Sequence, residues 1–439
     1  MSTSTPLATR ILWGLVIGVV AAVATLGFGQ FHPATLQAMQ AISTAVLDPF
    51  GQVFLRMLFF VVIPLVFASL ASGVAQLGRL DRLGPLALRT FGLFAANMLI
   101  GVAIGLLMMN LLQPGHHLAE GARALLMQEY GGGAMQAVQR KAEQPGLSLA
   151  VVVEMFMPRN LFGAFVGNSR NALGDVLPLI VFAILVGAAA TALPEDKRRR
   201  VQDGLDTLSE LMTGIVGFAL RLAPYAVPAM IYSVIVKVGV DVLLILSVFV
   251  VGCAAALMLH LFGTMSLWLR FLARRSPLAF FRQIRPLLVT AFSTSSSSAC
   301  LPASLAVAHD ELKLNPSTAG FVLPLGATMN MSGTALFEGC VVLFVAQAFG
   351  VELSLSHQAI LMLLSVLSAV AVAGIPGGSL PMIAGLLATF GIPPEGIGII
   401  IGVDRVLDMM RTTVNVGSDI VTATVVDNQL RDRFATTGP

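Results

Sequence analysis

The stretch FSTSSSSACLP, residues 292–302, gathers five serines and a threonine inside an otherwise apolar segment. A second polar break, GIPGGSLP at 374–381, interrupts another apolar segment nearer the C-terminus. Backbone groups freed by such breaks are tolerated at membrane depth only where they are buried in protein or line a cavity. We therefore expect two helical hairpins, over 286–309 and 357–395, with their breaks facing a cavity. Two kinked packing helices are the alternative.

Each predicted hairpin is followed by a helix that polar residues interrupt, at 328–338 and at 404–419. Two interrupted hairpins, each followed by a broken helix, indicate an internal repeat. In secondary transporters, paired interrupted segments of this kind mark the binding site. The breaks therefore predict a repeated unit that builds a site near the middle of a membrane.

The composition places the whole chain in a membrane. Of its 439 residues, 56% are hydrophobic and 11% are charged, the mean hydropathy is +0.87, and a soluble domain carries about 25% charged residues. This excludes a soluble enzyme with a single anchor. The basic residues lie in clusters between apolar segments, so they indicate topology rather than nucleic-acid binding. Cys253, Cys300 and Cys340 lack CxxC spacing and are expected to be reduced packing residues.

Several apolar segments are long enough to cross about 30 Å of hydrocarbon. They lie at 11–28, 46–77, 84–112, 173–193, 207–236 and 240–272. We interpret the first as an uncleaved transmembrane helix rather than a signal peptide. An N-terminus in the cytoplasm puts the basic clusters on that side, as the positive-inside rule requires. The connection over 113–160 then lies outside.

The segment GVDRVLDMMRTTVNVGSD, 402–419, carries an unusual polar stripe. Its charged and amide residues follow one another at steps of four, three, four and four: Asp404, Asp408, Arg411, Asn415 and Asp419. At about 100° per residue they share one helix face. Charges inside a membrane segment need a polar interior. Arg411 suits a carboxylate, Asp408 an ammonium and Asp419 a small cation; a mutually neutralising cluster is the alternative.

The other interrupted helix contains GATMNMSGTALFEG, 326–339. Gly326, Asn330, Thr334 and Glu338 recur every four residues, and the Asn-Met-Ser-Gly stretch is expected to unwind the helix. Glu338 is its only Asp, Glu, Lys, Arg or His. Because burial disfavours a charged carboxylate, Glu338 has the properties of a proton carrier. A neutral, hydrogen-bonded packing glutamate is the alternative.

Together, the motifs STSSSSACLP, NMSGT and DMMRTTVNVGSD, occurring in this order, resemble the dicarboxylate/amino acid:cation symporter family, which includes the excitatory amino acid transporters. The resemblance covers nearly the whole chain. It implies an all-α polytopic membrane protein with eight transmembrane helices, two re-entrant helical hairpins and inverted repeats. It also implies a homotrimer and an elevator-like movement.

The same resemblance implies a division of the chain into a scaffold and a mobile transport domain. The expected segments are 1–83 (scaffold helices 1 and 2), 84–112 (helix 3 of the transport domain), 113–239 (an extracellular loop and scaffold helices 4 and 5), 240–430 (the rest of the transport domain, with hairpins at 276–309 and 355–395) and 431–439 (a cytoplasmic tail).

By resemblance, Asp408 binds the substrate amino group and Arg411 its side-chain carboxylate. The remaining residues expected at the substrate are Ser295, Ser297, Thr334, Ile375, Ser379, Thr412 and Asn415. Relatives for neutral amino acids lack the arginine, and relatives for plain dicarboxylates lack the aspartate. Having both favours glutamate or aspartate.

The family's ion sites are only partly matched. One sodium site implies ligands at Gly326, Asn330, Asn415 and Asp419, and a second implies Thr328. The third has lost its anionic ligand, because Ser332 stands where relatives have aspartate. Glu338 falls where proton-cotransporting relatives have their proton-accepting glutamate. The pattern favours H⁺ as the coupling ion over Na⁺, and implies no cofactor.

The sequence therefore predicts a symporter rather than an enzyme, importing L-glutamate or L-aspartate across a bacterial inner membrane with both termini in the cytoplasm. Its expected partners are a small acidic substrate, membrane lipid and copies of itself, not nucleic acid. A sodium-coupled glutamate/aspartate or C4-dicarboxylate symporter is the alternative. A passive anion channel and an intramembrane serine protease using His309 are further alternatives; the protease lacks a GxSG-type signature.

Overall fold

The computed structural model describes residues 7–77, 84–118, 120–121, 123–125, 157–166, 176–372, 374 and 377–435. Every regular element in these ranges is a helix. The first half contains α1 (Leu7–Gly29), α2 (Pro33–Ile42), the π-helix η1 (Ser43–Leu47), α3 (Asp48–Phe60), α4 (Val62–Leu77), α5 (Gly84–Leu112), the 3-10 helix η3 (Pro114–His117), α9 (Leu161–Val166), α10 (Val176–Thr191) and α11 (Glu195–Val238).

The second half contains the elements that carry the motifs. They are α12 (Asp241–Met258), the π-helix η4 (Leu259–Thr264), α13 (Met265–Phe271), α14 (Pro277–Gln283), α15 (Arg285–Thr294), α16 (Ser297–Asp310), α17 (Pro316–Met329), α18 (Ser332–Ala348), α19 (Leu355–Ala371), α20 (Leu380–Thr389), the 3-10 helix η5 (Pro394–Ile399) and α21 (Ile401–Ala435).

Among the described residues, six helical stretches are long and apolar enough to cross a membrane. They are Thr9–Gly29, Pro33–Ala75, Leu86–His117, Glu195–Val238, Val242–Phe271 and Pro316–Ala348. The last is entirely buried within the protein, whereas the first is mostly exposed at its surface. Shorter apolar helices, Pro178–Thr191, Leu355–Ala371 and Leu380–Thr389, accompany them. The chain is thus a multi-pass helical protein.

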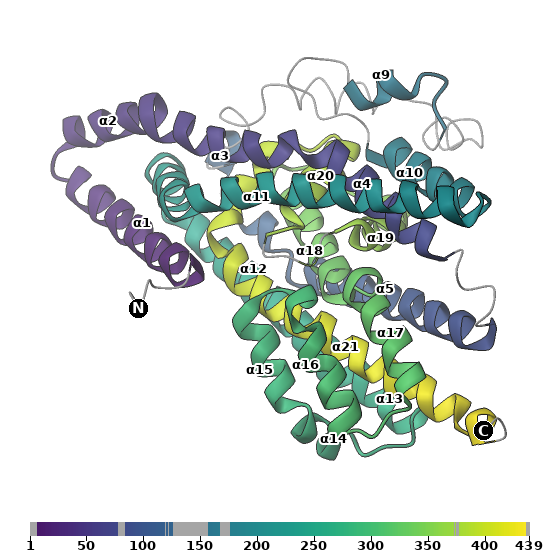
Figure 1. Ribbon diagram of the computed structural model, residues 1–439. Coiled ribbons are helices and arrows are strands. Elements are labelled where there is room, and N and C mark those ends of the chain that lie inside the picture. Colours follow the sequence, from purple (N-terminus) through teal and green to yellow (C-terminus); the bar gives the residue numbers. More distant parts are fainter. Residues whose placement is uncertain are drawn as a thin grey trace, which may run out of the picture.

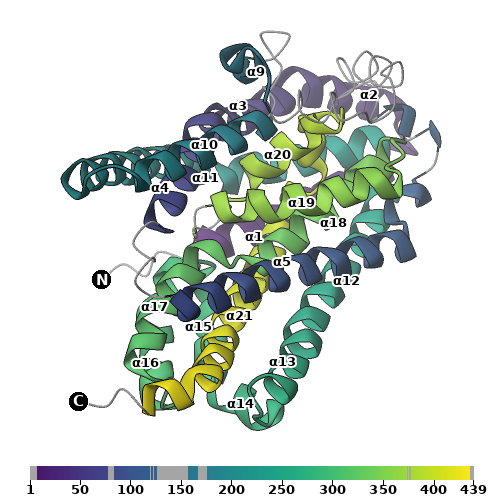
Figure 2. The same cartoon turned by 90° about the vertical axis from the view of Figure 1, so that its right-hand side faces the viewer.

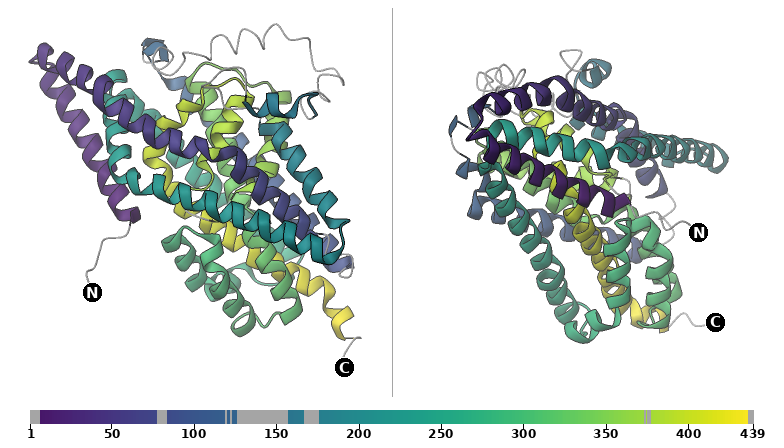
Figure 3. Two further views of the ribbon diagram at one scale, coloured as in Figure 1. Left: turned by 45° about the horizontal axis from the view of Figure 1, so that its top comes forward. Right: turned by 90° about the vertical axis from the view of Figure 1, so that its left-hand side faces the viewer.

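The helices pack in two sets (Figures 1 and 2). In one set, α11 packs along α1, α3 and α4, and α4 packs on α10. In the other set, α18 is surrounded by α5, α19 and α21, while α21 also packs on α15 and α17. The sets touch where α4 meets α19 and where α1 meets α21. The start of α1 and the end of α21 both lie in the half of the molecule away from α9 (Figure 3).

Small residues permit the closest helix contacts, as is usual in membranes. Gly18 on α1 lies against α11, where an added Cβ would be 2.8 Å from the Pro228 carbonyl oxygen. Gly105 on α5 lies against α18, where a Cβ would be 2.8 Å from the Leu336 carbonyl oxygen. Any side chain at these two glycines would force the helices apart.

Two predicted interruptions have different outcomes. The break in the first polar helix is confirmed: α17 ends at Met329, α18 begins at Ser332, and Asn330 and Met331 lie between them. The prediction that 404–419 is also interrupted is wrong, because α21 is continuous from Ile401 to Ala435. Its charged residues neutralise one another along the helix face, so the backbone has no need to unwind to bring partners to them.

Candidate substrate and ion site

The serine-rich stretch forms the turn between α15 and α16. Ser295 ends α15 with a left-handed backbone, φ 51°, and the Ser296 hydroxyl accepts a hydrogen bond from the Ala299 amide at 3.2 Å, capping α16. Serine is a preferred N-cap residue because its oxygen satisfies an amide that the first helical turn leaves without a partner. Ser296 of the polar cluster therefore helps the chain to reverse direction at this point.

The two polar breaks of the sequence touch each other. The Ser296 hydroxyl donates to the Gly374 carbonyl at 2.7 Å, which joins the α15–α16 turn to the α19–α20 connection. Gly374 leaves little room for a side chain, since an added Cβ would lie 2.6 Å from the Ser298 hydroxyl oxygen and 3.2 Å from the Ser298 amide nitrogen. The two interruptions thus close over the same region from different parts of the chain.

The unwound segment between α17 and α18 is stabilised by Asn415 of α21. The Asn415 side-chain oxygen accepts hydrogen bonds from the amides of Gly333 and Thr334, at 2.8 and 3.3 Å, and its amide nitrogen donates to the Thr334 hydroxyl at 3.1 Å. Asn415 therefore serves the first turn of α18 as a cap supplied by another helix, and fixes Thr334 beside α21.

The charged stripe of α21 is paired internally. Arg411 Nη2 lies 2.6 Å from Asp408 Oδ1, and Arg411 Nη1 lies 3.5 Å from Asp404 Oδ1. Arg405 Nη1 reaches the other Asp408 oxygen at 3.2 Å, where the amide of Gly377 also donates at 3.2 Å. Both oxygens of Asp408 are therefore occupied, and the α19–α20 connection is bonded directly to this carboxylate.

Arg411 is also held by an aromatic ring. Its guanidinium carbon lies 4.8 Å from the centroid of Phe337 on α18, a position for a cation–π contact. Phe337 is fully buried and Arg411 nearly so. The guanidinium is thus oriented by a ring on one side and two carboxylates on the other.

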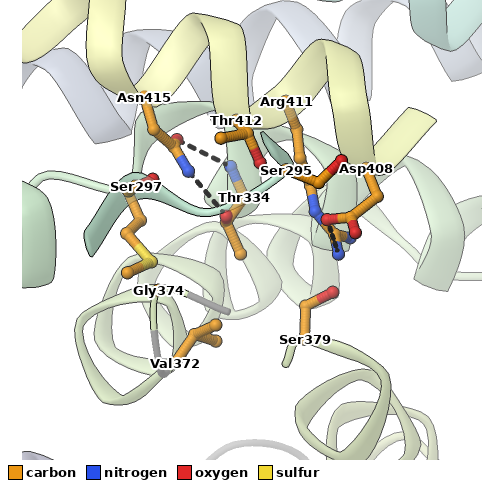
Figure 4. Close-up of a pocket in the computed structure, with 11 residues that line it drawn as sticks. Ser295, Ser297, Thr334, Val372, Gly374, Ser379, Asp408, Arg411, Thr412 and Asn415 are labelled. Atoms are coloured by element: carbon orange, nitrogen blue, oxygen red, sulfur yellow. Dashed lines mark hydrogen bonds and ion pairs between the residues drawn. The ribbon is translucent and has the colours of Figure 1, made fainter. Parts of the chain in front are cut away.

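These elements enclose a small polar cavity (Figure 4). Its lining is Ser295, Ser297, Met331, Thr334, Val372, Gly374, Ser379, Asp408, Arg411, Thr412 and Asn415. The cavity volume is about 10 Å³, which is room for about one water. The hydroxyls of Ser295 and Ser379 are buried and have no hydrogen-bond partner. A buried hydroxyl without a partner is unfavourable, so both are available to a ligand.

The cavity brings together eight of the nine residues predicted to contact substrate, namely Ser295, Ser297, Thr334, Ser379, Asp408, Arg411, Thr412 and Asn415. The ninth, Ile375, lies outside the described residues. Sequence reasoning assigned no role to Arg405 or Phe337. The spacing of Arg405 three residues before Asp408 is a signal for that ion pair, whereas the sequence carries no signal for the Phe337–Arg411 contact between helices.

The residues predicted to hold sodium are only partly gathered. Asn330 donates to Asp419 Oδ1 at 2.9 Å, and Gly326 lies so close that an added Cβ would be 2.6 Å from the same oxygen. Thr328 is exposed, and its hydroxyl donates to the Leu325 carbonyl. Among the described residues there is no group of three or more His, Cys, Asp or Glu side chains that could hold a metal ion.

Ser332, the residue expected to replace an anionic sodium ligand, belongs to a buried hydrogen-bond network. Its hydroxyl donates to Ser418 at 3.1 Å, Asn330 donates to Ser418 at 3.2 Å, and Asn97 of α5 donates to Asn330 at 2.9 Å. All four side chains are buried. The amides and hydroxyls of this network are linked through Asn330 to a single carboxylate, that of Asp419.

Glu338 lies one turn beyond Thr334 on α18. It has no exposed surface, and neither carboxyl oxygen has a hydrogen-bond partner. A buried carboxylate without a partner is strongly unfavourable, so this environment fits a protonated, neutral carboxyl.

The family comparison places this multi-pass helical chain among transporters rather than enzymes. The family model described as "Sodium:dicarboxylate symporter family" matches residues 7–429, and the chain belongs to this family. It is 30% identical over 424 residues to a proton/sodium-glutamate symport protein of Bacillus caldotenax, covering 96% of this chain and 93% of that protein.

Two further relatives differ in their described substrates. The chain is 26% identical to a proton/glutamate-aspartate symporter of Escherichia coli (strain K12), covering 96% of this chain and 92% of that protein. It is 29% identical to a C4-dicarboxylate transport protein of Anaeromyxobacter sp. (strain K), covering 87% of this chain and 83% of that protein.

Proposed function

We propose that the protein imports L-glutamate or L-aspartate together with protons across the bacterial inner membrane. The observation that carries the proposal is the ion pair between Arg411 and Asp408 in the cavity. An acidic amino acid offers one carboxylate to replace Asp408 on Arg411 and one ammonium to replace Arg411 on Asp408. Substrate binding then exchanges one buried ion pair for two, so neither charge is left without a partner.

The remaining polar groups of the cavity also suit an acidic amino acid. The substrate α-carboxylate is a suitable acceptor for the free hydroxyls of Ser295 and Ser379. Glu338 supplies the proton site, separate from the cavity but on the same helix as Thr334. The family resemblance supplies the rest of the proposal: eight transmembrane helices with two re-entrant hairpins, an elevator-type movement, a homotrimer and termini in the cytoplasm.

The test is uptake of labelled glutamate into proteoliposomes with the pH and sodium gradients imposed independently. We expect accumulation with an inward proton gradient in sodium-free buffer. Accumulation that requires sodium and ignores the pH gradient contradicts proton coupling. Flux that only equilibrates glutamate under either gradient indicates a passive channel.

A C4-dicarboxylate substrate is the second candidate, because Arg405 already occupies the Asp408 oxygen that an ammonium needs. We expect Arg405→Ala to raise the affinity for glutamate by about tenfold, since it removes a competing cation worth roughly 1.4 kcal/mol, and to leave the affinity for succinate unchanged. The measurement is inhibition of labelled glutamate uptake by each unlabelled compound. Stronger inhibition by succinate than by glutamate in the unmodified protein favours the dicarboxylate function.

Sodium coupling is tested by placing an anionic side chain at Ser332. We expect Ser332→Asp to make the protein depend on a cation, because the network around Ser332 contains the Asp419 carboxylate but no basic side chain to pair with a second one. Uptake and melting temperature should then increase when sodium replaces choline, an effect absent from the unmodified protein. Ser317→Asp, at the exposed start of α17, is the matched control. Equal sodium stimulation of the unmodified protein argues for sodium coupling instead.

A further inference from the structure

The helix α19 carries two buried serines whose hydroxyls have no hydrogen-bond partner, Ser365 and Ser368. Serine and threonine in a helix commonly donate to the carbonyl four residues earlier. Ser247 and Thr424 do so in this protein, at 2.7 Å each. The hydroxyls of Ser365 and Ser368 do not make that bond, and both side chains are fully buried, so they cannot hydrogen-bond to bulk water instead. A buried polar group of this kind calls for a functional explanation.

Ser368 lies beside Glu338. The helices α18 and α19 pack on each other, and they bring the Ser368 hydroxyl into the surroundings of the Glu338 carboxyl. The two groups do not reach hydrogen-bond geometry, because Ser368 Oγ and both Glu338 oxygens are without partners.

The charged groups around Glu338 are few. Arg411, from α21, is the charged side chain that acts on it. The other titratable groups on the helices packed against α18 have partners of their own or lie at helix ends. On α21, Asp404 and Asp408 pair with Arg411, Arg405 pairs with Asp408, and Asp419 and Asp427 accept hydrogen bonds from Asn330 and from the Asn315 amide. On the other elements, Cys253 of α12 lies beside Cys340, Arg89 of α5 donates to the Gln429 carbonyl, His357 is exposed at the start of α19, and His116 and His117 of η3 are exposed at the far end of α18. The unpartnered Ser368 hydroxyl is therefore available as an uncharged hydrogen-bond donor for a Glu338 carboxylate.

We propose that Ser368 is a positioning residue for proton exchange at Glu338, donating its hydroxyl hydrogen bond to the carboxylate when the proton has left. The proton moves between the carboxyl and water, giving carboxylate and hydronium, and the Ser368 hydroxyl keeps its own hydrogen throughout. This inference rests on the proposed proton coupling. It also connects that coupling to the cavity, because α19 leads directly into Val372 and Gly374, which line it.

The test compares the pH dependence of glutamate uptake in the unmodified protein and in Ser368→Ala. Without the donor the charged carboxylate is disfavoured, so Glu338 keeps its proton to higher pH. The alkaline decline of uptake should therefore move upward by about one pH unit, as expected for loss of a hydrogen bond to a charged group. Uptake at acidic pH, where the carboxyl is protonated in both proteins, should be unchanged and reports correct folding.

Two further variants make the result specific. Ser365→Ala removes an equally buried hydroxyl from the same face of α19 and should leave the pH profile unmoved. Ser368→Thr keeps a hydroxyl and should restore the original profile. An unshifted Ser368→Ala profile, or equal shifts in Ser365→Ala and Ser368→Ala, overturns the role of Ser368.

The variant Glu338→Gln distinguishes an error in the role of Ser368 from an error in the proposed proton coupling. A pH-dependent unmodified protein with a flat Glu338→Gln profile establishes titration at Glu338, so an unshifted Ser368→Ala profile then overturns the serine's role alone. Identical pH dependence of the unmodified protein and Glu338→Gln overturns proton coupling through Glu338, and the inference falls with it.

Discussion

Replacing Arg411 by cysteine should abolish uptake of acidic amino acids at ordinary concentrations and permit neutral ones. The variant removes the guanidinium that would hold the substrate's side-chain carboxylate, while Asp408 remains for the ammonium. Removing one partner of a buried ion pair costs about 3–5 kcal/mol, which lowers the affinity for glutamate by roughly 150-fold to 4,000-fold. The measurement is competition for uptake between labelled glutamate and labelled serine or alanine.

The control for this change is Arg221→Cys. Arg221 is an exposed arginine on α11 whose guanidinium lies over the Phe218 ring, so the same substitution there should leave glutamate affinity within twofold or so of the original. Undiminished glutamate uptake by Arg411→Cys would show that Arg411 does not contact the substrate carboxylate. Loss of all amino acid uptake, with the variant correctly folded, would assign Arg411 to the structure of α21 instead.

Replacing Glu338 by glutamine should uncouple transport from protons. Glutamine keeps the size of the side chain and stays neutral at every pH, so the protein resembles one in which the carboxyl never loses its proton. We expect the pH gradient to drive no accumulation of glutamate, while exchange of internal for external labelled glutamate continues. Exchange needs no net proton movement and shows that the substrate cavity is intact.

A second glutamate serves as the matched control. Glu352 is exposed in the connection between α18 and α19, and Glu352→Gln should retain full proton-driven accumulation. Proton-driven uptake that survives Glu338→Gln at the original level would place the proton site elsewhere in the protein. The buried, unpartnered state of the Glu338 carboxyl would then be a feature of packing around α18.

Several features of the site could be predicted from the sequence because they follow from spacing along one helix. Residues three and four apart on α21 share a face, so the stripe from Asp404 to Asp419 is a direct consequence of helix geometry. The unwound Asn330–Met331 segment could be predicted from a polar cluster in an apolar helix. The continuity of α21 could not, because whether charges break a helix depends on the partners they find.

What the sequence alone determined is the apolar helical character of the chain, the two polar breaks and the charged stripe, since composition and periodicity are local properties. Only the tertiary structure decided which of these meet. The Ser296–Gly374 hydrogen bond joins the two breaks, Asn415 caps α18 from α21, and Phe337 orients Arg411. These contacts link residues far apart in the chain, and their geometry arises from helix packing rather than from spacing along any one segment.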